Sequence, residues 1–294
     1  MWSDDAVSTP SDSPAPTVDP EALRLVAVRI ATEAAEHLRG LPRPWESGGA
    51  EGSVATKSTP TDVVTASDTA VETLVRERLA ALRPADAVVG EEHGGSAGVD
   101  PDRVVWVVDP IDGTVNFLYG LPWYAISVAA TRAGRSLAGA VVEPDSGRVW
   151  SAALGRGAMC DGRRLAASGA TDPALSLLGT GFAYDGTRRA RQAGMVAALL
   201  PRVRDVRRTG SAALDLCAVA AGWTDGYLEH GCNWWDWAAA ALVAQEAGAV
   251  VRTPGVAGLV APDDGLGADA LLAAAPGVAE ALAGLARDAG AASV

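Results

Sequence analysis

The stretch Trp106-Val107-Val108-Asp109-Pro110-Ile111-Asp112-Gly113-Thr114 runs from apolar residues straight into two carboxylates, a proline, a glycine and a hydroxyl. An apolar run that ends in turn residues predicts a buried strand. Pro110 fixes the turn, and Gly113 lets the backbone approach a ligand closely. Because ligands of layered α/β folds bind where strands end, the stretch predicts a binding site at the end of a buried strand.

The two aspartates of this stretch favour a divalent metal. Asp109 and Asp112 lie three residues apart and repel each other when both are ionised, unless a cation sits between them. Magnesium suits carboxylate and carbonyl oxygens and is commonly completed by phosphate. A helix that begins just after Gly113 would also present free amides to an anion. On these residues alone, an Asp-Pro turn that caps a helix is an alternative explanation.

Further acidic residues occur at two other predicted strand ends. Glu91-Glu92 follows the apolar run 87–89, and Glu229 ends the run 226–229. Asp236 lies in the Trp-Trp-Asp-Trp sequence that opens an alanine-rich helix. Each has an ordinary alternative, because an acidic pair is common in solvated loops and an acid in the first turn complements the helix dipole.

Periodicity and turn residues predict an alternation of helices and strands, and hence a layered α/β sandwich. The predicted helices are 20–40, 67–83, 188–200, 211–221, 234–247 and 278–288. The predicted strands are 87–89, 104–108, 124–131, 137–142, 148–153, 175–180, 226–229, 249–252 and 271–274. Turn residues at 133–134 and 145–147 suit tight hairpins, so the strands in the middle of the chain form a largely antiparallel sheet.

Length and composition indicate one continuous domain. The chain has 294 residues, of which 49% are apolar, enough for a substantial core. We expect a domain over 21–294 with halves at about 21–165 and 166–294. The stretch 1–20 is rich in Ser, Pro and Asp and lacks a basic start, so we expect a disordered tail rather than a signal peptide. No run approaches the about 18 apolar residues of a membrane span, and we expect a cytoplasmic protein.

Charge and cysteines exclude several classes of function. The formal net charge of −12 argues against nucleic acid as a partner. The four arginines within 202–208 are the one basic cluster, which a solvated connection beside a helix end explains about as well as a binding patch does. Cys160, Cys217 and Cys232 are widely spaced and form no CxxC pair. They indicate neither a disulfide framework nor a zinc site.

Taken together, the motifs resemble those of the inositol monophosphatase family. The matching passages are Lys57, Asp62-Val63-Val64-Thr65 with Asp68, Gly90-Glu91-Glu92, Asp109-Pro110-Ile111-Asp112-Gly113-Thr114, Gly210-Ser211-Ala212-Ala213, Glu229, and Trp235-Asp236 with Glu246-Ala247-Gly248. The resemblance implies a layered αβαβα sandwich (α/β, or α+β) and a phosphatase of the inositol-phosphate type. It also implies two to three magnesium ions.

The resemblance assigns metal ligands to individual residues. Glu91, Asp109 and the carbonyl of Ile111 would hold one magnesium ion, and Asp109, Asp112 and Asp236 would hold a second. A third ion would be bound largely through water near Glu91. Lys57, the only lysine of the chain, would balance these carboxylates, although a surface lysine is an alternative.

The resemblance also assigns catalytic and substrate-binding residues. The nucleophile would be a water molecule activated by magnesium, with Thr114 and Asp68 as the activating pair and Glu91 assisting. Substrate hydroxyls would meet Asp112, Ser211, Ala212, Glu229 and Asp236, and phosphate oxygens would meet the amides of Gly113 and Thr114. No covalent intermediate is implied.

Inositol 1-phosphate is the substrate that the resemblance favours. Histidinol phosphate, fructose 1,6-bisphosphate and 3'-phosphoadenosine 5'-phosphate stay open because relatives share the metal core. A non-catalytic interaction protein is a further alternative, whereas metal storage lacks the expected ligand clusters. Val115 replaces a small hydroxyl residue of the family, and the bulky 232–234 stretch leaves the identity of the alcohol open. The resemblance further implies a homodimer and inhibition by lithium.

Overall fold

The computed structural model describes residues 18–43, 54–56, 63–95, 102–256 and 259–294 of the chain. Its helices are α1 (Pro20–Gly40), α2 (Ala66–Leu82), α3 (Thr114–Tyr119), α4 (Gly186–Leu199), α5 (Ala212–Ala220), α6 (Trp234–Glu246) and α7 (Ala279–Asp288). The predicted helices agree with these bounds to within two residues. A helix directly after Gly113 was considered from the sequence, and α3 begins there.

The first sheet has the strand order β3-β4-β5-β6-β7-β8-β9. Its strands are β3 (Ala87–Gly90), β4 (Val105–Asp112), β5 (Ala125–Arg132), β6 (Arg135–Val142), β7 (Val149–Ala153), β8 (Gly157–Cys160) and β9 (Arg163–Arg164). Only the β3–β4 pair is parallel, which confirms a largely antiparallel sheet. The β5–β6 hairpin closes over Ala133 and Gly134, both with positive φ, as a two-residue turn requires.

The second sheet is smaller and mixed, with the order β11-β10-β12-β14-β13. Its strands are β10 (Leu177–Thr180), β11 (Asp205–Arg207), β12 (Gly226–His230), β13 (Val250–Arg252) and β14 (Ala270–Ala274). Strand β10 runs parallel to β11 and β12, whereas β14 runs antiparallel to β12 and β13. A short separate ribbon pairs β1 (Val54–Thr56) with β2 (Val63–Thr65).

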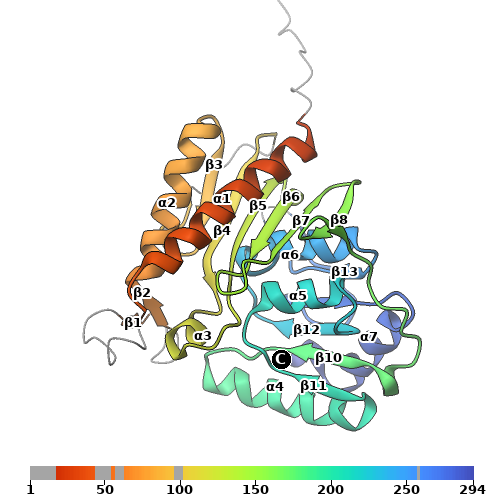
Figure 1. Ribbon diagram of the computed structural model, residues 1–294. Helices are drawn as coiled ribbons and strands as arrows, with labels where there is room; N and C mark the ends of the chain where they lie inside the picture. Colours follow the sequence, from red (N-terminus) through yellow and green to blue (C-terminus); the bar gives the residue numbers. More distant parts are fainter. Residues whose placement is uncertain (1–17, 44–53, 57–62, 96–101, 257–258) are drawn as a thin grey trace, which may run out of the picture.

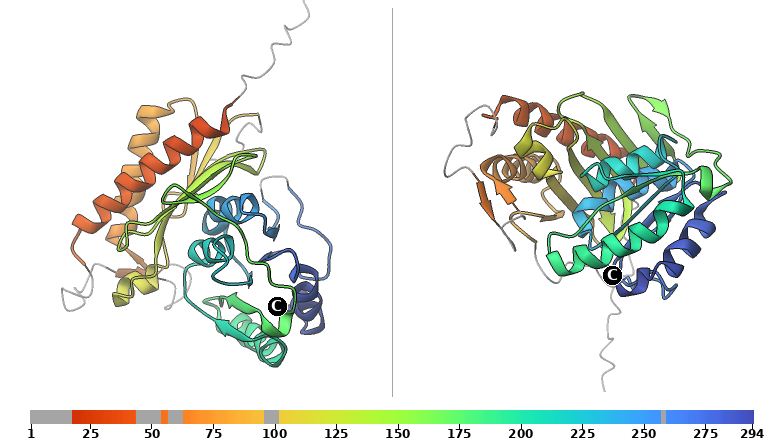
Figure 2. Two further views of the ribbon diagram at one scale, coloured as in Figure 1. Left: turned by 45° about the vertical axis from the view of Figure 1, so that its right-hand side comes forward. Right: turned by 90° about the horizontal axis from the view of Figure 1, so that it is seen from below.

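The elements stack in five layers, which confirms the αβαβα sandwich (Figure 1). Helices α1 and α2 cover one face of the first sheet, and α5 and α6 fill the space between the two sheets. Helices α4 and α7 lie beyond the second sheet, as both views of Figure 2 show. Three clusters of buried side chains occupy the interfaces between these layers.

The structure differs from the predictions at short elements. A 3-10 turn, Pro173–Leu175, stands where a strand was expected to begin, because Asp172 caps it and Pro173 occupies its first position. No strand was predicted in the arginine-rich stretch 202–208, for which a solvated connection and a binding patch were both left open, yet it contains edge strand β11. Strands β1, β2, β8 and β9 were also missed, since two to four residues carry too little periodicity. Within the described part of the chain, no helix has the length and apolarity to cross a bilayer.

Candidate active site

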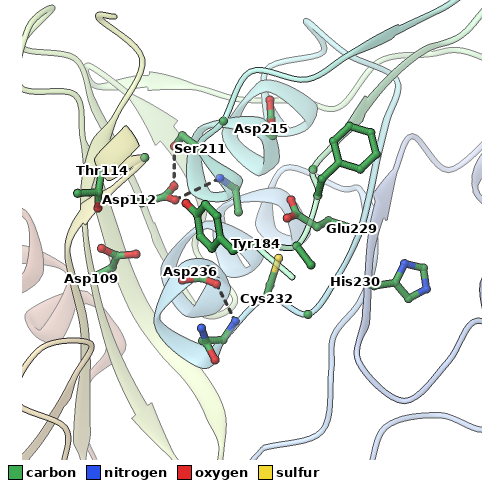
Figure 3. A pocket seen from close by; sticks show the side chains of 18 of the residues that line it. Asp109, Asp112, Thr114, Tyr184, Ser211, Asp215, Glu229, His230, Cys232 and Asp236 are labelled. Atoms are coloured by element: carbon green, nitrogen blue, oxygen red, sulfur yellow. Dashed lines mark hydrogen bonds between the residues drawn. The ribbon is translucent and has the colours of Figure 1, made fainter. Parts of the chain in front are cut away.

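A cavity of about 370 Å³ opens between the two sheets, where the ends of several elements meet. The end of β4 and the start of α3 form one wall, and the loops after β10 and β12 and the start of α5 form the other. Figure 3 shows the labelled side chains around this space. The cavity brings together, among its lining residues, Glu91, Asp109, Ile111, Asp112, Gly113, Thr114, Ser211, Ala212, Glu229 and Asp236. Of the predicted catalytic, substrate and metal residues, only Asp68 lies behind the cavity wall.

Asp109 and Asp112 lie at the end of strand β4, where its pairing with β5 shifts register. The shift follows from Pro110, which has no amide proton to give to a neighbouring strand. Asp109 is 2% exposed, and its Oδ1 accepts the Ile111 amide at 3.0 Å. Burial raises the pKa of Asp109 well above its ordinary value, and the charges of Glu91 and Asp112 raise it further. The fold therefore brings several carboxylates close together at this end of β4.

Asp112 is held by the start of α5. Its Oδ2 accepts the Ser211 hydroxyl at 2.5 Å, and its Oδ1 accepts the Ala212 amide at 3.3 Å (Figure 3). The same Oδ2 also accepts the Ala213 amide at 2.7 Å. Burial nevertheless raises its pKa to about 7, against the lowering effect of these donors. The contacts join β4 of the first sheet to a helix of the middle layer.

Thr114 and Asp68 form a buried pair on the other side of β4. The Thr114 hydroxyl lies 3.1 Å from Asp68 Oδ1 and 2.9 Å from the carbonyl of Ile111. Asp68 is the third residue of α2 and accepts both the amide and the hydroxyl of Thr65, at 2.8 and 2.5 Å, in a capping box. Burial raises the pKa of Asp68 to about 6. The carboxyl group that faces Thr114 is therefore a proton acceptor close to neutral pH.

Asp236 and Glu91 complete the acidic side of the cavity. Asp236 stands at the third position of α6, and its Oδ2 accepts the Asn233 amide at 2.6 Å. Asp236 thus lies in the first turn of the helix, as its ordinary explanation requires, and it also lies in the cavity wall. Burial, and then the charge of Asp112, raises its pKa well above the ordinary value. Glu91 follows β3, and a hydrogen bond links its carboxyl group to that of Asp109.

The opposite wall carries Glu229 near the end of β12. Its carboxyl group contacts the Tyr227 hydroxyl and the thiol of Cys232. Burial raises the pKa of Glu229, while nearby Arg208 and Arg188 lower it. Cys232 is a free thiol in this wall, in keeping with the absence of a disulfide signal in the sequence.

Several lining residues were not predicted as site residues. Asp215 in α5 accepts the Thr209 hydroxyl at 2.5 Å, and burial raises its pKa to about 8. Arg188, Arg208 and Tyr184 also line the cavity. Arg208 stands two residues before the Gly210-Ser211 motif, and this proximity is the signal that could have marked it as a site residue. Tyr184 and Arg188 have no comparable signal in the sequence, because they lie on a loop and a helix whose packing depends on the second sheet.

The donors on the acidic side fit magnesium by their chemistry, since all are carboxylate or carbonyl oxygens. As they stand, however, no three or more His, Cys, Asp or Glu side chains in the described ranges are grouped as a ready-made metal site. Lys57 and Asp62 of the sequence motifs lie outside the described residues.

Comparisons with known proteins agree with this geometry. The sequence model of the inositol monophosphatase family matches residues 19–290. The chain is 53% identical over 280 residues to "Inositol-1-monophosphatase" of Mycobacterium leprae, covering 91% of this chain and 94% of the relative. It is 40% identical over 191 residues to "Nus factor SuhB" of Escherichia coli, covering 65% of this chain and 71% of that protein. The solved structure of Mycobacterium tuberculosis SuhB superposes with a TM-score of 0.76 at 42% identity, covering 93% of this chain and 99% of that one. The chain therefore belongs to the inositol monophosphatase family.

Proposed function

We propose that the protein is a magnesium-dependent phosphatase that hydrolyses inositol 1-phosphate to inositol and phosphate. The observation that carries the proposal is the meeting of four carboxylates from three elements, beside a buried Thr114–Asp68 pair, in one cavity. Relatives named inositol-1-monophosphatase, about half identical to this chain over most of its length, support the choice of substrate.

The metal ligands in this proposal are Glu91, Asp109, Asp112, Asp236 and the carbonyl of Ile111. Two to three magnesium ions would lower the pKa of a bound water and neutralise charge as phosphate is displaced. The chain's contribution is a set of oxygen donors whose repulsion is relieved only by cations. Among these ligands, Asp109, Asp112, Glu91 and the Ile111 carbonyl come from the end of β4 and the loop after β3, and Asp236 comes from the start of α6.

Thr114 and Asp68 handle the proton of the attacking water. When the Thr114 hydroxyl donates to Asp68 Oδ1, its lone pairs are left to accept a proton from water in the cavity. Asp68 then takes the threonine proton, and the negative charge of nearby Glu91 assists this transfer. The carbonyl of Ile111, 2.9 Å from the hydroxyl, is the alternative acceptor of that same proton when Thr114 does not donate to Asp68. The water attacks directly, so the chain forms no covalent intermediate.

The remaining lining residues orient the substrate. The amides of Gly113 and Thr114, at the start of α3, bind phosphate oxygens in this proposal. The inositol hydroxyls bind Asp112, Glu229 and Asp236. They also bind the backbone around Ser211 and Ala212. Because the Ser211 and Ala213 contacts hold Asp112 in one orientation, the polyol meets a fixed acceptor rather than a mobile one.

Phosphate release tests the proposal directly. Purified protein is assayed with inositol 1-phosphate, histidinol phosphate, fructose 1,6-bisphosphate and 3'-phosphoadenosine 5'-phosphate, with magnesium and with a chelator. We expect inositol 1-phosphate to be hydrolysed and the activity to vanish with chelator. The proposal is contradicted if hydrolysis persists in the presence of chelator, or if none of the four compounds is hydrolysed.

The relatives named Nus factor SuhB keep an interaction role as a second candidate. Asp109→Asn separates the two roles, because it removes a shared metal ligand without changing the shape of the side chain. A catalyst should lose turnover by about 100-fold or more, while a pure interaction protein should be unaffected. Asp161→Asn is the matched control, since Asp161 is exposed and lies outside the cavity.

A further inference from the structure

Glu72 is a fully buried carboxylate that lies behind the cavity wall. It belongs to α2, is 0% exposed and does not line the cavity. Burying a carboxylate is unfavourable unless hydrogen-bond donors surround it. Glu72 stands four residues after Asp68, so both carboxyl groups come from the same face of α2. Asp68 faces Thr114, whereas the proposed function gives Glu72 no task.

The loop that follows β3 supplies two backbone donors to Glu72. Glu72 Oε2 accepts the amide of Glu92 at 2.7 Å, and Oε1 accepts the amide of His93 at 3.2 Å. The ring nitrogen Nδ1 of His93 also lies 3.2 Å from Oε1. Glu92 and His93 are the two residues directly after Glu91, a proposed metal ligand. Glu72 therefore fixes the course of the backbone just after Glu91.

Arg76, one turn later in α2, ties the far end of the same loop to the helix. Its Nε donates to Glu72 Oε1 at 2.7 Å, and its Nη2 donates to the carbonyl of Gly94 at 2.5 Å. The Gly94 carbonyl also accepts the amide of Gly90 at 3.0 Å, which closes the loop on itself. The guanidinium and the two loop amides together compensate for the burial of the Glu72 carboxylate.

The start of the loop is fitted to the same carboxyl group. A Cβ atom added to Gly90 would overlap the carboxyl group of Glu72. The amide of Glu91 donates to the Val108 carbonyl at 3.2 Å, which binds this side of the loop to β4. Glu91 is thus held between β4 and Glu72, and its carboxyl group is hydrogen-bonded to that of Asp109.

We propose that Glu72 is a positioning residue of the metal site, because it holds the loop that presents Glu91 to the cavity. The inference rests on the proposed function, in which Glu91 is a metal ligand. Groups that orient metal ligands by hydrogen bonds matter nearly as much as the ligands, and losing one weakens metal binding by about 10- to 100-fold. Helix α2 then serves the site twice, through Asp68 in the proton path and through Glu72 behind the metal ligand.

Glu72→Gln tests the inference, because it keeps the shape of the side chain and replaces one acceptor oxygen by an amide nitrogen that cannot accept. Magnesium binding to the metal-free protein is measured by calorimetric titration, and phosphate release is measured over a range of magnesium concentrations. We expect the Kd for magnesium to rise about tenfold or more, and the magnesium concentration for half-maximal activity to rise with it. At saturating magnesium, kcat should stay close to the wild-type value, since Glu72 does not line the cavity.

Glu143→Gln is the matched control. Glu143 is also a buried glutamate, but it pairs with Arg148 at 2.9 Å and accepts the Ser146 hydroxyl at 2.8 Å, in a turn outside the cavity. This variant should lower stability without changing the Kd for magnesium. If Glu72→Gln does not fold, Arg76→Ala decides by the same titration, because Arg76 is partly exposed and its loss still frees one end of the loop.

Amide hydrogen exchange of the metal-free proteins separates this inference from the proposed function. Exchange at residues 91–95 should be faster in Glu72→Gln than in the wild type and unchanged in Glu143→Gln. Equal exchange in all three proteins, or an unchanged Kd for magnesium in folded Glu72→Gln, overturns the inference while the phosphatase function stands. A wild-type protein that neither binds magnesium nor releases phosphate contradicts the proposed function instead, whatever the exchange of the loop.

Discussion

Thr114 holds its hydroxyl between two acceptors, Asp68 Oδ1 and the Ile111 carbonyl, so its removal tests the proton path at one atom. We expect Thr114→Val to lower kcat by about 100- to 10,000-fold, the usual contribution of a positioned proton acceptor. Thr114→Ser should retain much of the activity because it keeps the hydroxyl. The measurement is steady-state phosphate release with magnesium in excess.

Thr131→Val is the control for that experiment. Thr131 is likewise a buried threonine, but it lies in β5, and its hydroxyl donates to the Val105 carbonyl at 2.9 Å, away from the cavity. It should cost about 1 kcal/mol of stability and leave kcat unchanged. A Thr114→Val protein that turns over at the wild-type rate would remove Thr114 from the mechanism.

Asp215 predicts a dependence of stability on pH. Its pKa is raised to about 8 in the folded chain, mainly by burial, from an ordinary value near 4. In the folded state it therefore keeps a proton that the unfolded chain has lost, and stability falls as pH rises from about 4 to 8. One such group contributes a slope of at most about 1.4 kcal/mol per pH unit. Urea unfolding in chelator at pH 5, 6.5 and 8 measures the slope.

Asp215→Asn should flatten this slope and raise the stability at pH 8 relative to the wild type. Asparagine cannot ionise, and its oxygen can still accept the Thr209 hydroxyl. Asp205→Asn is the control: the Asp205 side chain is half-exposed and its pKa is lowered by Arg207, so it is ionised in both states over this range. A parallel slope in wild type and Asp215→Asn would show that Asp215 is ionised in the folded protein.

At the level of elements, Asn116 ties α3 to the loop that begins α5. Its Nδ2 donates to the Trp123 carbonyl at 2.7 Å and to the Thr209 carbonyl at 2.9 Å. Asn116→Ala leaves both carbonyls without this donor. We expect a loss of about 1–3 kcal/mol in unfolding free energy and a raised KM, because Ser211 follows directly on this loop.

Urea unfolding and substrate saturation curves measure the two effects. Thr73→Ala is the control, since it also removes a donor to a backbone carbonyl, but on the exposed face of α2. A change of stability without any change of KM would restrict Asn116 to a structural role.

Long elements were predictable because their residues carry a repeated signal. In α1, Asp19 caps the first turn, Pro20 follows, and the helix ends at Gly40, all of which can be read from local chemistry. Strand β11 could not be read this way, since its three residues are stabilised by pairing with β10. The pairing of distant strands depends on the whole fold, and periodicity within one segment does not report it.

The candidate site was predictable to the extent that motifs mark it. Asp109, Asp112 and Asp236 were named from their strand and helix ends and from the family resemblance, and the fold brings them to one cavity. Arg208 was weighed only as part of a basic cluster, because its contact with the cavity depends on how β11 is placed beside β10. Sequence motifs therefore identified the acidic wall of the cavity. The position of the arginine at its other end depends on tertiary packing.

On the scale of the whole molecule, the site depends on the distance between the first sheet and the middle layer of helices. Asp109 and Asp112 belong to β4, whereas Asp236 belongs to α6, which packs on the same sheet. Gly139 of β6 lies at this interface. A Cβ atom added to it would come within 2.8 Å of the Ala239 Cα, a backbone atom of α6 that cannot rotate away.

Gly139→Ala should therefore push α6 away from the first sheet and separate the proposed metal ligands. We expect about 1–3 kcal/mol of destabilisation, the usual cost of overpacking, together with weaker magnesium binding in a calorimetric titration. Gly194→Ala is the control, because nothing lies within 4 Å of its added Cβ in α4 and alanine favours a helix by about 0.5–1 kcal/mol. Weaker magnesium binding in the folded Gly139→Ala protein, with binding unchanged in Gly194→Ala, would locate the metal site across this interface. Unchanged binding in both would mean that the ions are held by the first sheet alone, without Asp236.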